Sequence, residues 1–161
     1  MNNKVVNAIV PTNDKFVDDK IVRFNPSCNL ETVRDGRGGI FTWVPPEPIL
    51  EWNMLIFHPN KIRGNHYHLE FVEYFMVVEG YGTMVSRDKA GKEVFYHLSK
   101  GQCLRVPIGV PHAFYAIEFT TAMAFLTKRW DDCDPPIIFE DVINSSNDPT
   151  AFPVTPPKPN K

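Results

Sequence analysis

Three histidines and one glutamate stand in two short segments whose spacing suits coordination of a metal ion. In the first segment, Asn65–Gly80, His66 and His68 are two residues apart, so on a strand both imidazoles point to the same face. Glu73 follows His68 by five residues, an odd offset that would send its carboxylate to the opposite face of one unbroken strand. We therefore expect the chain to bend over Leu69–Val72 and Glu73 to open the next strand.

A fourth ligand is expected from the second segment, Gly101–His112. There a Pro-x-Gly turn precedes a histidine that would stand near the start of a strand. Three imidazoles and one carboxylate suit a divalent transition metal such as Zn, Fe, Mn, Ni or Co. The alternative is a hydrogen-bonded polar cluster or an empty cavity. The sequence predicts one such ion, held by His66, His68, Glu73 and His112.

Strands are the elements expected to position these residues. Fifteen prolines and nine glycines leave no room for a long helix, and the stretches between them are rich in β-branched, aromatic or alternating apolar residues. The hairpin expected at Arg87–Gly91 would join two of them. The prediction is an all-β sandwich or barrel with strands at Trp52–His58, Phe71–Val78, Gly82–Ser86, Val94–Leu98, Gln102–Val106, Ala113–Glu118 and Ala122–Lys128.

The two ends of the chain differ from this central region. Lys4–Val10 and Ile21–Phe24 are expected to form short edge strands, and Asp35–Gly39 a turn-rich joint that leads into Ile40–Val44. Asp148–Lys161 contains five prolines and is expected to be extended or disordered. The predicted division is a single domain with an N-terminal arm at 1–39, a barrel at 40–147 and a proline-rich tail at 148–161.

Composition narrows the class of ligand and the compartment. Seventeen Lys and Arg against nineteen Asp and Glu give a formal net charge of -2, which disfavours sequence-independent binding of nucleic acid. No apolar run approaches the roughly 20 residues of a membrane helix, and no signal peptide is recognised. Cys28, Cys103 and Cys133 are scattered and odd in number, which favours reduced thiols. We expect a cytoplasmic protein with a small-molecule ligand.

The two histidine segments resemble the paired motifs of the cupin superfamily. His66, His68, Glu73 and Gly80 match the first motif, and Gly101, Pro107, Gly109 and His112 match the second. Ala116 replaces the asparagine that ends the second motif, and Gly64 lies closer to the histidines than the usual upstream glycine. The resemblance implies a single cupin, a double-stranded β-helix or jelly-roll barrel, with a metal site.

Three further segments are similar to signatures of cupins that act on deoxysugar nucleotides. They are Asp35–Phe41, Arg63–His68 and Val106–Phe114. This group includes 4-keto-6-deoxyhexose 3,5-epimerases, 3,4-ketoisomerases and the C-terminal cupin domain of capsular-polysaccharide synthesis proteins. The resemblance implies a metal-dependent epimerase or isomerase of a nucleotide-linked 4-keto-deoxysugar in polysaccharide biosynthesis. A homodimer formed through the N-terminal arm is also expected. Phe75 departs from the metal-free 3,5-epimerases, which carry a catalytic lysine at that position.

The substrate-binding residues are expected to be Arg63, Phe75 and Phe114. The resemblance makes Arg63 a contact for the substrate diphosphate, because a guanidinium matches phosphate oxygens bidentately. Strand parity, however, puts Arg63 on the face opposite His66. Parity also predicts that Phe75 and Phe114 share the face of the metal and shape the pocket.

The catalytic base is left open among three residues and a metal-bound hydroxide. His66 corresponds to the base of the metal-free relatives but is a ligand in a metal cupin. The other two candidates are Tyr115 and His58, the latter brought in by folding. Two other functions fit the same ligand set. One is an Fe(II)-dependent dioxygenase, and the other is a non-catalytic module that binds a metal or a sugar.

Overall fold

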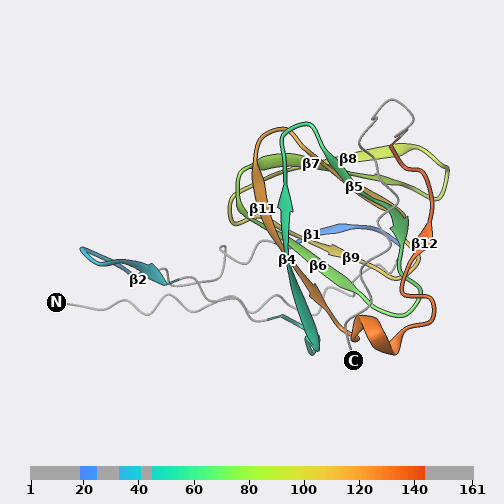
Figure 1. Ribbon diagram of the computed structural model, residues 1–161, viewed down its shortest axis with the longest axis horizontal. Helices are drawn as coiled ribbons and strands as arrows, with labels where there is room; N and C mark the ends of the chain where they lie inside the picture. The colour runs from blue at the N-terminus through green and yellow to red at the C-terminus, as the bar shows by residue number, and fades with distance from the viewer. Residues whose placement is uncertain (1–18, 25–32, 41–44, 144–161) are drawn as a thin grey trace.

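The fold consists of two five-stranded antiparallel sheets and a separate two-stranded hairpin (Figure 1). It is seen in a computed structural model that describes residues 19–24, 33–40 and 45–143. The first sheet has the order β1 (Val22–Phe24), β9 (Cys103–Val106), β6 (Glu73–Glu79), β11 (Thr120–Leu126) and β4 (Glu51–Phe57). The second has the order β12 (Ile138–Phe139), β5 (Ile62–Tyr67), β10 (His112–Ala116), β7 (Tyr81–Arg87) and β8 (Glu93–Ser99).

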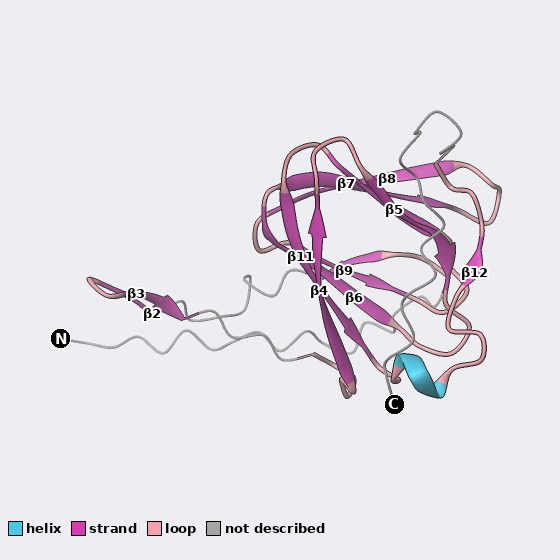
Figure 2. Ribbon diagram, viewed as in Figure 1, coloured by secondary structure: helices cyan, strands magenta, loops and turns pink. Residues whose placement is uncertain are grey.

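The all-β jelly-roll prediction is confirmed by this arrangement of two facing antiparallel sheets (Figure 2). Each of the seven predicted central strands corresponds to one observed strand between β4 and β11. Strand β5 is the one strand in this range that was not among the seven. The hairpin predicted at Arg87–Gly91 joins β7 and β8, and the Asp88 carboxylate accepts hydrogen bonds from the backbone N–H groups of Ala90 and Lys92, both at 2.9 Å.

The predicted N-terminal arm divides into two parts among the described residues. The edge strand predicted at Ile21–Phe24 is β1, which pairs with β9 and so belongs to the barrel. The segment predicted as a turn-rich joint is a hairpin of β2 (Val33–Asp35) and β3 (Gly38–Ile40). The predicted strand Lys4–Val10, the tail 148–161 and Cys28 lie outside the described residues.

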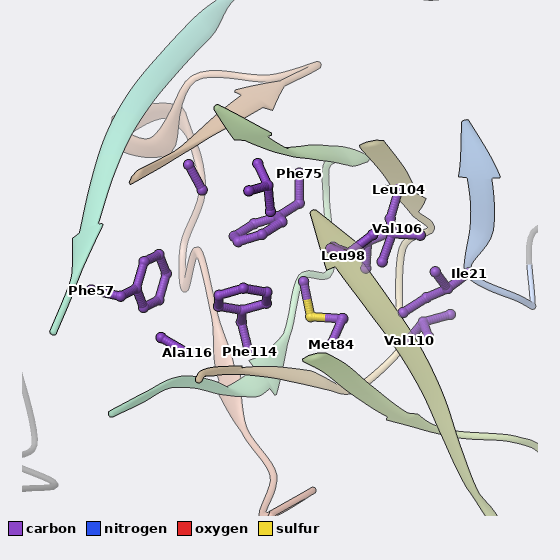
Figure 3. Close-up of a cluster of buried hydrophobic side chains, with 12 residues drawn as sticks. Ile21, Phe57, Phe75, Met84, Leu98, Leu104, Val106, Val110, Phe114 and Ala116 are labelled. Atoms are coloured by element: carbon purple, nitrogen blue, oxygen red, sulfur yellow. The ribbon is translucent and has the colours of Figure 1, made fainter. Parts of the chain in front are cut away.

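Aromatic and aliphatic side chains fill much of the interior of the barrel (Figure 3). Phe57, Phe75 and Phe114 come from three different strands and form the centre of this cluster. The ring centroids of Phe57 and Phe114 are 5.0 Å apart, and those of Phe75 and Phe114 are 4.9 Å apart. Phe57, Phe75 and Phe114 line the same cavity as His66, His68, Glu73 and His112, so the aromatic cluster borders the polar one.

Two other sequence expectations concern the described residues. Cys103 and Cys133 are both free and buried, as expected of reduced thiols. Within the described ranges, the single 3₁₀ turn at Trp130–Asp132 is far too short to cross a membrane, and no other helix there has the length and apolarity to do so.

Candidate metal centre

The three histidines and the glutamate predicted as ligands converge inside the barrel. Their candidate ligand atoms all lie within 4.8 Å of one another. Nε2 of His68 is 3.0 Å and Nε2 of His112 is 3.3 Å from the same oxygen, Oε2 of Glu73. His66 completes the group, with its ring centroid 4.9 Å from those of His68 and His112.

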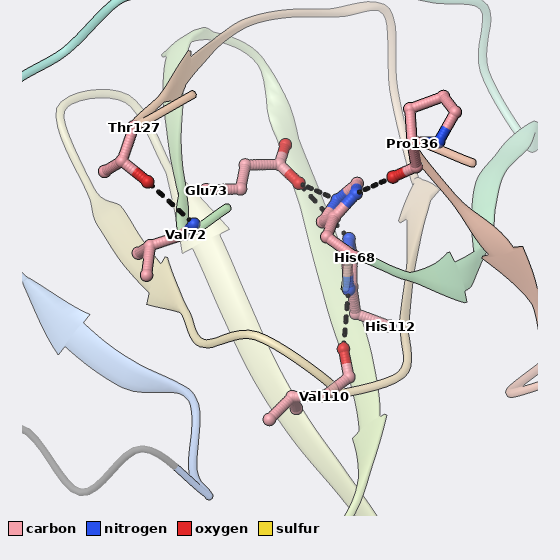
Figure 4. Close-up of polar contacts among 7 residues, drawn as sticks. All are labelled: His68, Val72, Glu73, Val110, His112, Thr127 and Pro136. Carbon is pink, nitrogen blue, oxygen red and sulfur yellow. Dashed lines mark hydrogen bonds and ion pairs between the residues drawn. The ribbon is translucent and has the colours of Figure 1, made fainter. Parts of the chain in front are cut away.

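The bend expected between His68 and Glu73 is present and brings the carboxylate to the imidazoles. Strand β5 ends at Tyr67, and β6 begins at Glu73. The backbone N–H of Val72 donates to Thr127 Oγ1 at 2.9 Å, which fixes the end of the bend against the residue after β11 (Figure 4). Phe71, fully buried, packs against the ring of His68 with centroids 4.1 Å apart.

The second segment is tied to the first through its turn. Gly109 has φ +75°, in the left-handed region that favours glycine, and its N–H donates to the carbonyl of His68 at 2.8 Å. This hydrogen bond sets the distance between the two segments. His112 then begins β10 directly opposite His66 on β5.

Backbone carbonyls orient two of the imidazoles (Figure 4). Nδ1 of His112 lies 3.0 Å from the carbonyl of Val110, and Nδ1 of His68 lies 3.3 Å from the carbonyl of Pro136. A carbonyl only accepts, so each Nδ1 donates to it, and Nε2 is the nitrogen of each ring that is directed toward Glu73. This is the ring orientation that a histidine ligand needs, because Nε2 then becomes available to a cation when it gives up its proton.

The charge states of the cluster also suit a cation. Burial raises the pKa of Glu73, but hydrogen bonds from His112 and His68 outweigh it and hold that pKa well below its usual range. Burial, followed by the neighbouring His112 and His68, lowers the pKa of His66 to about 3. At neutral pH the cluster therefore contains one carboxylate and a neutral His66. A divalent transition metal fits this donor set of one buried anion and imidazole nitrogens.

The position of Arg63 differs from the parity expectation, because β5 contains a bulge. His112 pairs with His66 and Ala113 pairs with Gly64, so Asn65 is an extra residue in β5. One extra residue reverses the alternation, and Arg63 therefore faces the same cavity as His66. Its guanidinium lies 5.9 Å from the ring centroid of Phe57. The prediction that Arg63 lies on the opposite face is wrong.

Glycine is required at position 64 for two reasons. Gly64 has φ +108°, and a Cβ there would lie 2.7 Å from the carbonyl oxygen of His112 and 2.8 Å from Cα of Ala113. Both contacts are with backbone and cannot move aside. The glycine of the Arg-Gly pair before the histidines is therefore required by the close approach of β10.

A cavity of about 1120 Å³ opens from the cluster to the surface. Phe75 and Phe114 line it, as parity predicts, and His58 lines it as well. Tyr115 is not brought to this site. Phe114 faces inward, so the next residue, Tyr115, points outward. Its hydroxyl donates to Asn60 Oδ1 at 2.8 Å.

The sequence reading missed several residues that line the cavity. Glu51 and Asn53 face inward from β4, and their alternation with exposed apolar residues is the signal that could have found them. Apart from the four converging residues, the basic residues of the wall come from residues 58–63, whereas the acidic ones come from β4 and the chain after β11. The latter segment has no periodicity that predicts it, and it contributes Trp130, Asp131, Ile137, Phe139 and Asp141.

The bulge residue Asn65 holds the segment 138–143 against the cavity. Asn65 has φ +56°, and its side chain donates to the carbonyl of Ile143 at 3.1 Å. Its Oδ1 accepts the N–H groups of Val142 at 3.1 Å and Ile143 at 2.9 Å. Its own carbonyl accepts the N–H of Glu140 at 2.8 Å. One asparagine thus fixes both the strand of His66 and the segment that lies beside it.

Solved structures of sugar-nucleotide enzymes share this fold. The dTDP-4-dehydrorhamnose 3,5-epimerase from Sulfolobus tokodaii is 23% identical, with a TM-score of 0.58 over 68% of this chain and 70% of the epimerase. A 3,4-ketoisomerase from Helicobacter canadensis is 14% identical, with a TM-score of 0.63 over 73% of this chain and 89% of the isomerase.

The capsular polysaccharide assembling protein CapF from Staphylococcus aureus is 23% identical, with a TM-score of 0.54 over 69% of this chain. The match covers 32% of CapF, so this chain corresponds to about a third of that protein. No curated protein sequence matches the chain.

The family match covers the hairpin, every barrel strand from β4 to β11 and the four converging residues. The profile of the polysaccharide biosynthesis C-terminal domain matches residues 33–132, more than half of the sequence. That span includes both histidine segments and ends within the 3₁₀ turn after β11. The chain has the cupin fold of sugar-nucleotide enzymes and belongs to the polysaccharide biosynthesis C-terminal domain family.

Proposed function

We propose that this protein is a metal-dependent epimerase or isomerase of a nucleotide-linked 4-keto-deoxysugar in polysaccharide biosynthesis. One observation carries the proposal: His66, His68, Glu73 and His112 converge at the inner end of an open cavity whose rim holds an arginine. The family match to polysaccharide biosynthesis and the shared fold with sugar-nucleotide epimerases and ketoisomerases support it.

The four ligands would hold a divalent cation, which when bound supplies a Lewis acid for a ketone. The chain's own groups then select and orient the substrate. Arg63 faces the cavity, and Lys61 and His58 line it from the same stretch of chain. A guanidinium and an ammonium there suit a diphosphate, as a nucleotide-linked sugar carries. The aromatic side chains Phe75 and Phe114 close the inner end and exclude water from it.

The geometry separates the three residues predicted to be catalytic. Tyr115 points away from the cavity. His66 is a poor proton acceptor, because an imidazole whose pKa is lowered to about 3 resists protonation, and it is suited to ligation instead. His58 lines the cavity and is the remaining member of the set. We therefore assign proton transfer at the carbon next to the ketone to His58.

Solvent exchange tests the proposal. The metal-loaded protein, incubated without oxygen in deuterated buffer with a panel of nucleotide-linked 4-ketohexoses, is expected to place deuterium at the carbon next to the ketone. Mass spectrometry measures the incorporation. Glu73→Gln is expected to suppress it by weakening the metal site, and His58→Gln by removing the proton acceptor. His97→Gln, outside the cavity, is the matched control for His58.

Arginine 63 has its own test within the same assay. Arg63→Gln is expected to raise KM at least tenfold with little change in kcat, because the group that recognises the diphosphate is distant from the reacting carbon. Arg129→Gln, exposed and outside the cavity, is expected to leave both values unchanged. Absence of exchange across the panel, with substrate-dependent oxygen uptake by iron-loaded protein, would favour a dioxygenase and overturn the proposal.

A further inference from the structure

A second carboxylate faces the cavity at the level of the metal cluster. Strands β4, β11 and β6 are neighbours, and their register places Glu51, Leu126 and Glu73 in one row across the sheet. Glu51 and Glu73 both line the cavity. Adjacent strands are about 4.8 Å apart, so the backbones of the two glutamates are about 10 Å apart. Glu51 therefore lies beside the cluster without being one of its four members.

The carboxylate of Glu51 is held in place by two neutral donors. Its Oε1 accepts a hydrogen bond from the side-chain amide of Asn53 at 3.0 Å, and its Oε2 accepts one from the backbone N–H of Trp130 at 2.8 Å. A carboxylate has about four acceptor positions, so the two bonds orient it and leave acceptor capacity for a ligand. Because both donors are neutral, they leave its negative charge available as well.

Aliphatic side chains of β11 form the wall between the two carboxylates. Leu126 lies between them in the row, and Ala124 occupies the next inward position of the same strand. Both line the cavity. The side chain of Ala124 is a single methyl group, so it leaves room beside the row. Polar groups at two ends and aliphatic groups between them complement the hydroxyl groups and the C–H groups of a sugar ring.

A carboxylate limits the kind of group that a ligand can place against it. It only accepts hydrogen bonds, so it binds a hydroxyl or an N–H group and disfavours a group that only accepts. A 4-keto-6-deoxyhexose linked through C1 to a diphosphate has hydroxyl groups only at C2 and C3. The C3 hydroxyl is adjacent to the ketone and so stays near the metal cluster. The C2 hydroxyl is then the donor that is free to reach Glu51.

We propose that Glu51 determines the specificity for the sugar by accepting a hydrogen bond from its C2 substituent. This assignment rests on the proposed function, which supplies the hexose and its ketone. It adds a substrate class: nucleotide-linked 6-deoxyhexoses with a hydroxyl or N–H donor at C2 bind, and 2,6-dideoxyhexoses are rejected. The reason for rejection is that a sugar without the donor takes water from the carboxylate and gives no hydrogen bond in return.

Calorimetry of ligand binding tests the assignment without requiring turnover. The zinc-loaded full chain is titrated with dTDP-linked and UDP-linked 6-deoxyglucose, and with the 2,6-dideoxyglucose form of each. Wild-type protein is expected to bind the 2-hydroxy ligands at least about 20-fold more tightly than the 2-deoxy ligands, because a hydrogen bond to a charged group is lost. Glu51→Gln is expected to lower this ratio to about threefold, because only a neutral hydrogen bond remains possible.

The ratio of affinities separates recognition of the sugar from support of the fold. Glu51→Gln keeps an oxygen that can accept the N–H of Trp130, so the turn after β11 is retained. If Glu51 only supports the fold, the variant lowers the affinity for both sugars alike and leaves the ratio unchanged. Glu93→Gln is the matched control, because Glu93 is exposed at the start of β8 and does not line the cavity. Elemental analysis confirms that all proteins carry equal zinc.

The outcomes distinguish this assignment from the proposed function. If none of the nucleotide-linked sugars binds, the proposed function fails and the assignment fails with it. If wild-type protein binds the 2-hydroxy and 2-deoxy ligands equally, or if Glu51→Gln keeps the wild-type ratio, the assignment alone is overturned. Should Glu51→Gln not fold, the 2-fluoro ligand decides with wild-type protein. Fluorine carries no proton to donate, so this ligand must bind as weakly as the 2-deoxy ligand, and binding as tight as that of the 2-hydroxy ligand overturns the assignment.

Discussion

Two clusters of charged and polar residues lie on opposite faces of strand β6 and have opposite chemical character. Glu73 and Tyr74 are consecutive residues of β6, so Glu73 points into the barrel and Tyr74 points out. Outside, the Arg105 guanidinium donates to both oxygens of Glu47, at 3.0 and 3.2 Å, and Tyr74 donates to the same carboxylate. Inside, the carboxylate of Glu73 meets imidazoles alone.

The difference lies in whether the chain itself balances the charge. Glu47 has a permanent cation beside it. Although burial raises its pKa, the bonds from Arg105 and Tyr74 hold that pKa below its usual range. Glu73 has no lysine or arginine among its described partners, and the groups that contact it are the Nε2 atoms of two imidazoles. A balanced cluster stabilises the fold, whereas a buried carboxylate surrounded by converging imidazole nitrogens and by no permanent cation is suited to a metal ion.

The largest expected effect is loss of metal from the inner cluster. Glu73→Gln or His68→Ala is expected to weaken binding of Zn²⁺ or Fe²⁺ at least about 100-fold, because each removes one of four ligands. Elemental analysis and competition with a chelating dye measure the change. Glu47→Gln, in the outer cluster, is the matched control. If wild-type protein takes up none of Zn, Fe, Mn, Ni or Co, the contrast between the clusters is broken.

The next effect is a loss of stability without loss of metal. Arg105→Met is expected to lower the free energy of unfolding by about 2 kcal/mol, because Glu47 and Tyr74 lose their cation while Glu47 stays partly exposed to water. Urea denaturation measures the difference. Metal affinity should change less than threefold. A variant as stable as the wild type would show that the outer cluster contributes nothing to folding.

A pH titration of metal-free protein should distinguish the clusters again. The pKa of His66 is about 3 when folded, against 6.5 when unfolded, so the unfolded chain binds the extra proton. The contribution of His66 to the free energy of unfolding is therefore fully present above pH 6.5. It falls by up to about 1.4 kcal/mol per pH unit as the pH drops toward 3. Glu47 titrates below its ordinary value and contributes nothing between pH 6.5 and 5. In chelator, His66→Gln should flatten the curve in that window, and an unchanged slope would contradict the assignment.

The smallest effect is expected at Asn65, a neutral side chain that is fully hydrogen-bonded to the segment beside the metal cluster. Asn65→Asp keeps the acceptor for Val142 and Ile143 but removes the donor to the carbonyl of Ile143. We expect a loss of about 1 kcal/mol in stability and faster hydrogen exchange of residues 138–143. Metal affinity should stay within threefold. A tenfold loss of metal would place Asn65 in the metal site rather than in its wall.

The sequence predicted the strands and the ligand set because both depend on local spacing. Two histidines two residues apart share a face on any strand, and the odd offset to Glu73 required the bend that β5 and β6 show. Proline and glycine between short apolar stretches excluded long helices and located the turns. Phe75 and Phe114 reached the cavity for the same reason of parity.

The remainder depended on tertiary structure, because it involves residues far apart in sequence. The bulge at Asn65 arises where β5 pairs with β10, and it alone reverses the side on which Arg63 lies. Tyr115 points away from the cavity because its neighbour Phe114 points into it. Glu51 lines the cavity because β4 forms one side of the barrel. Residue type and spacing fix which groups can converge. Only the pairing of distant strands decides which of them face the same cavity.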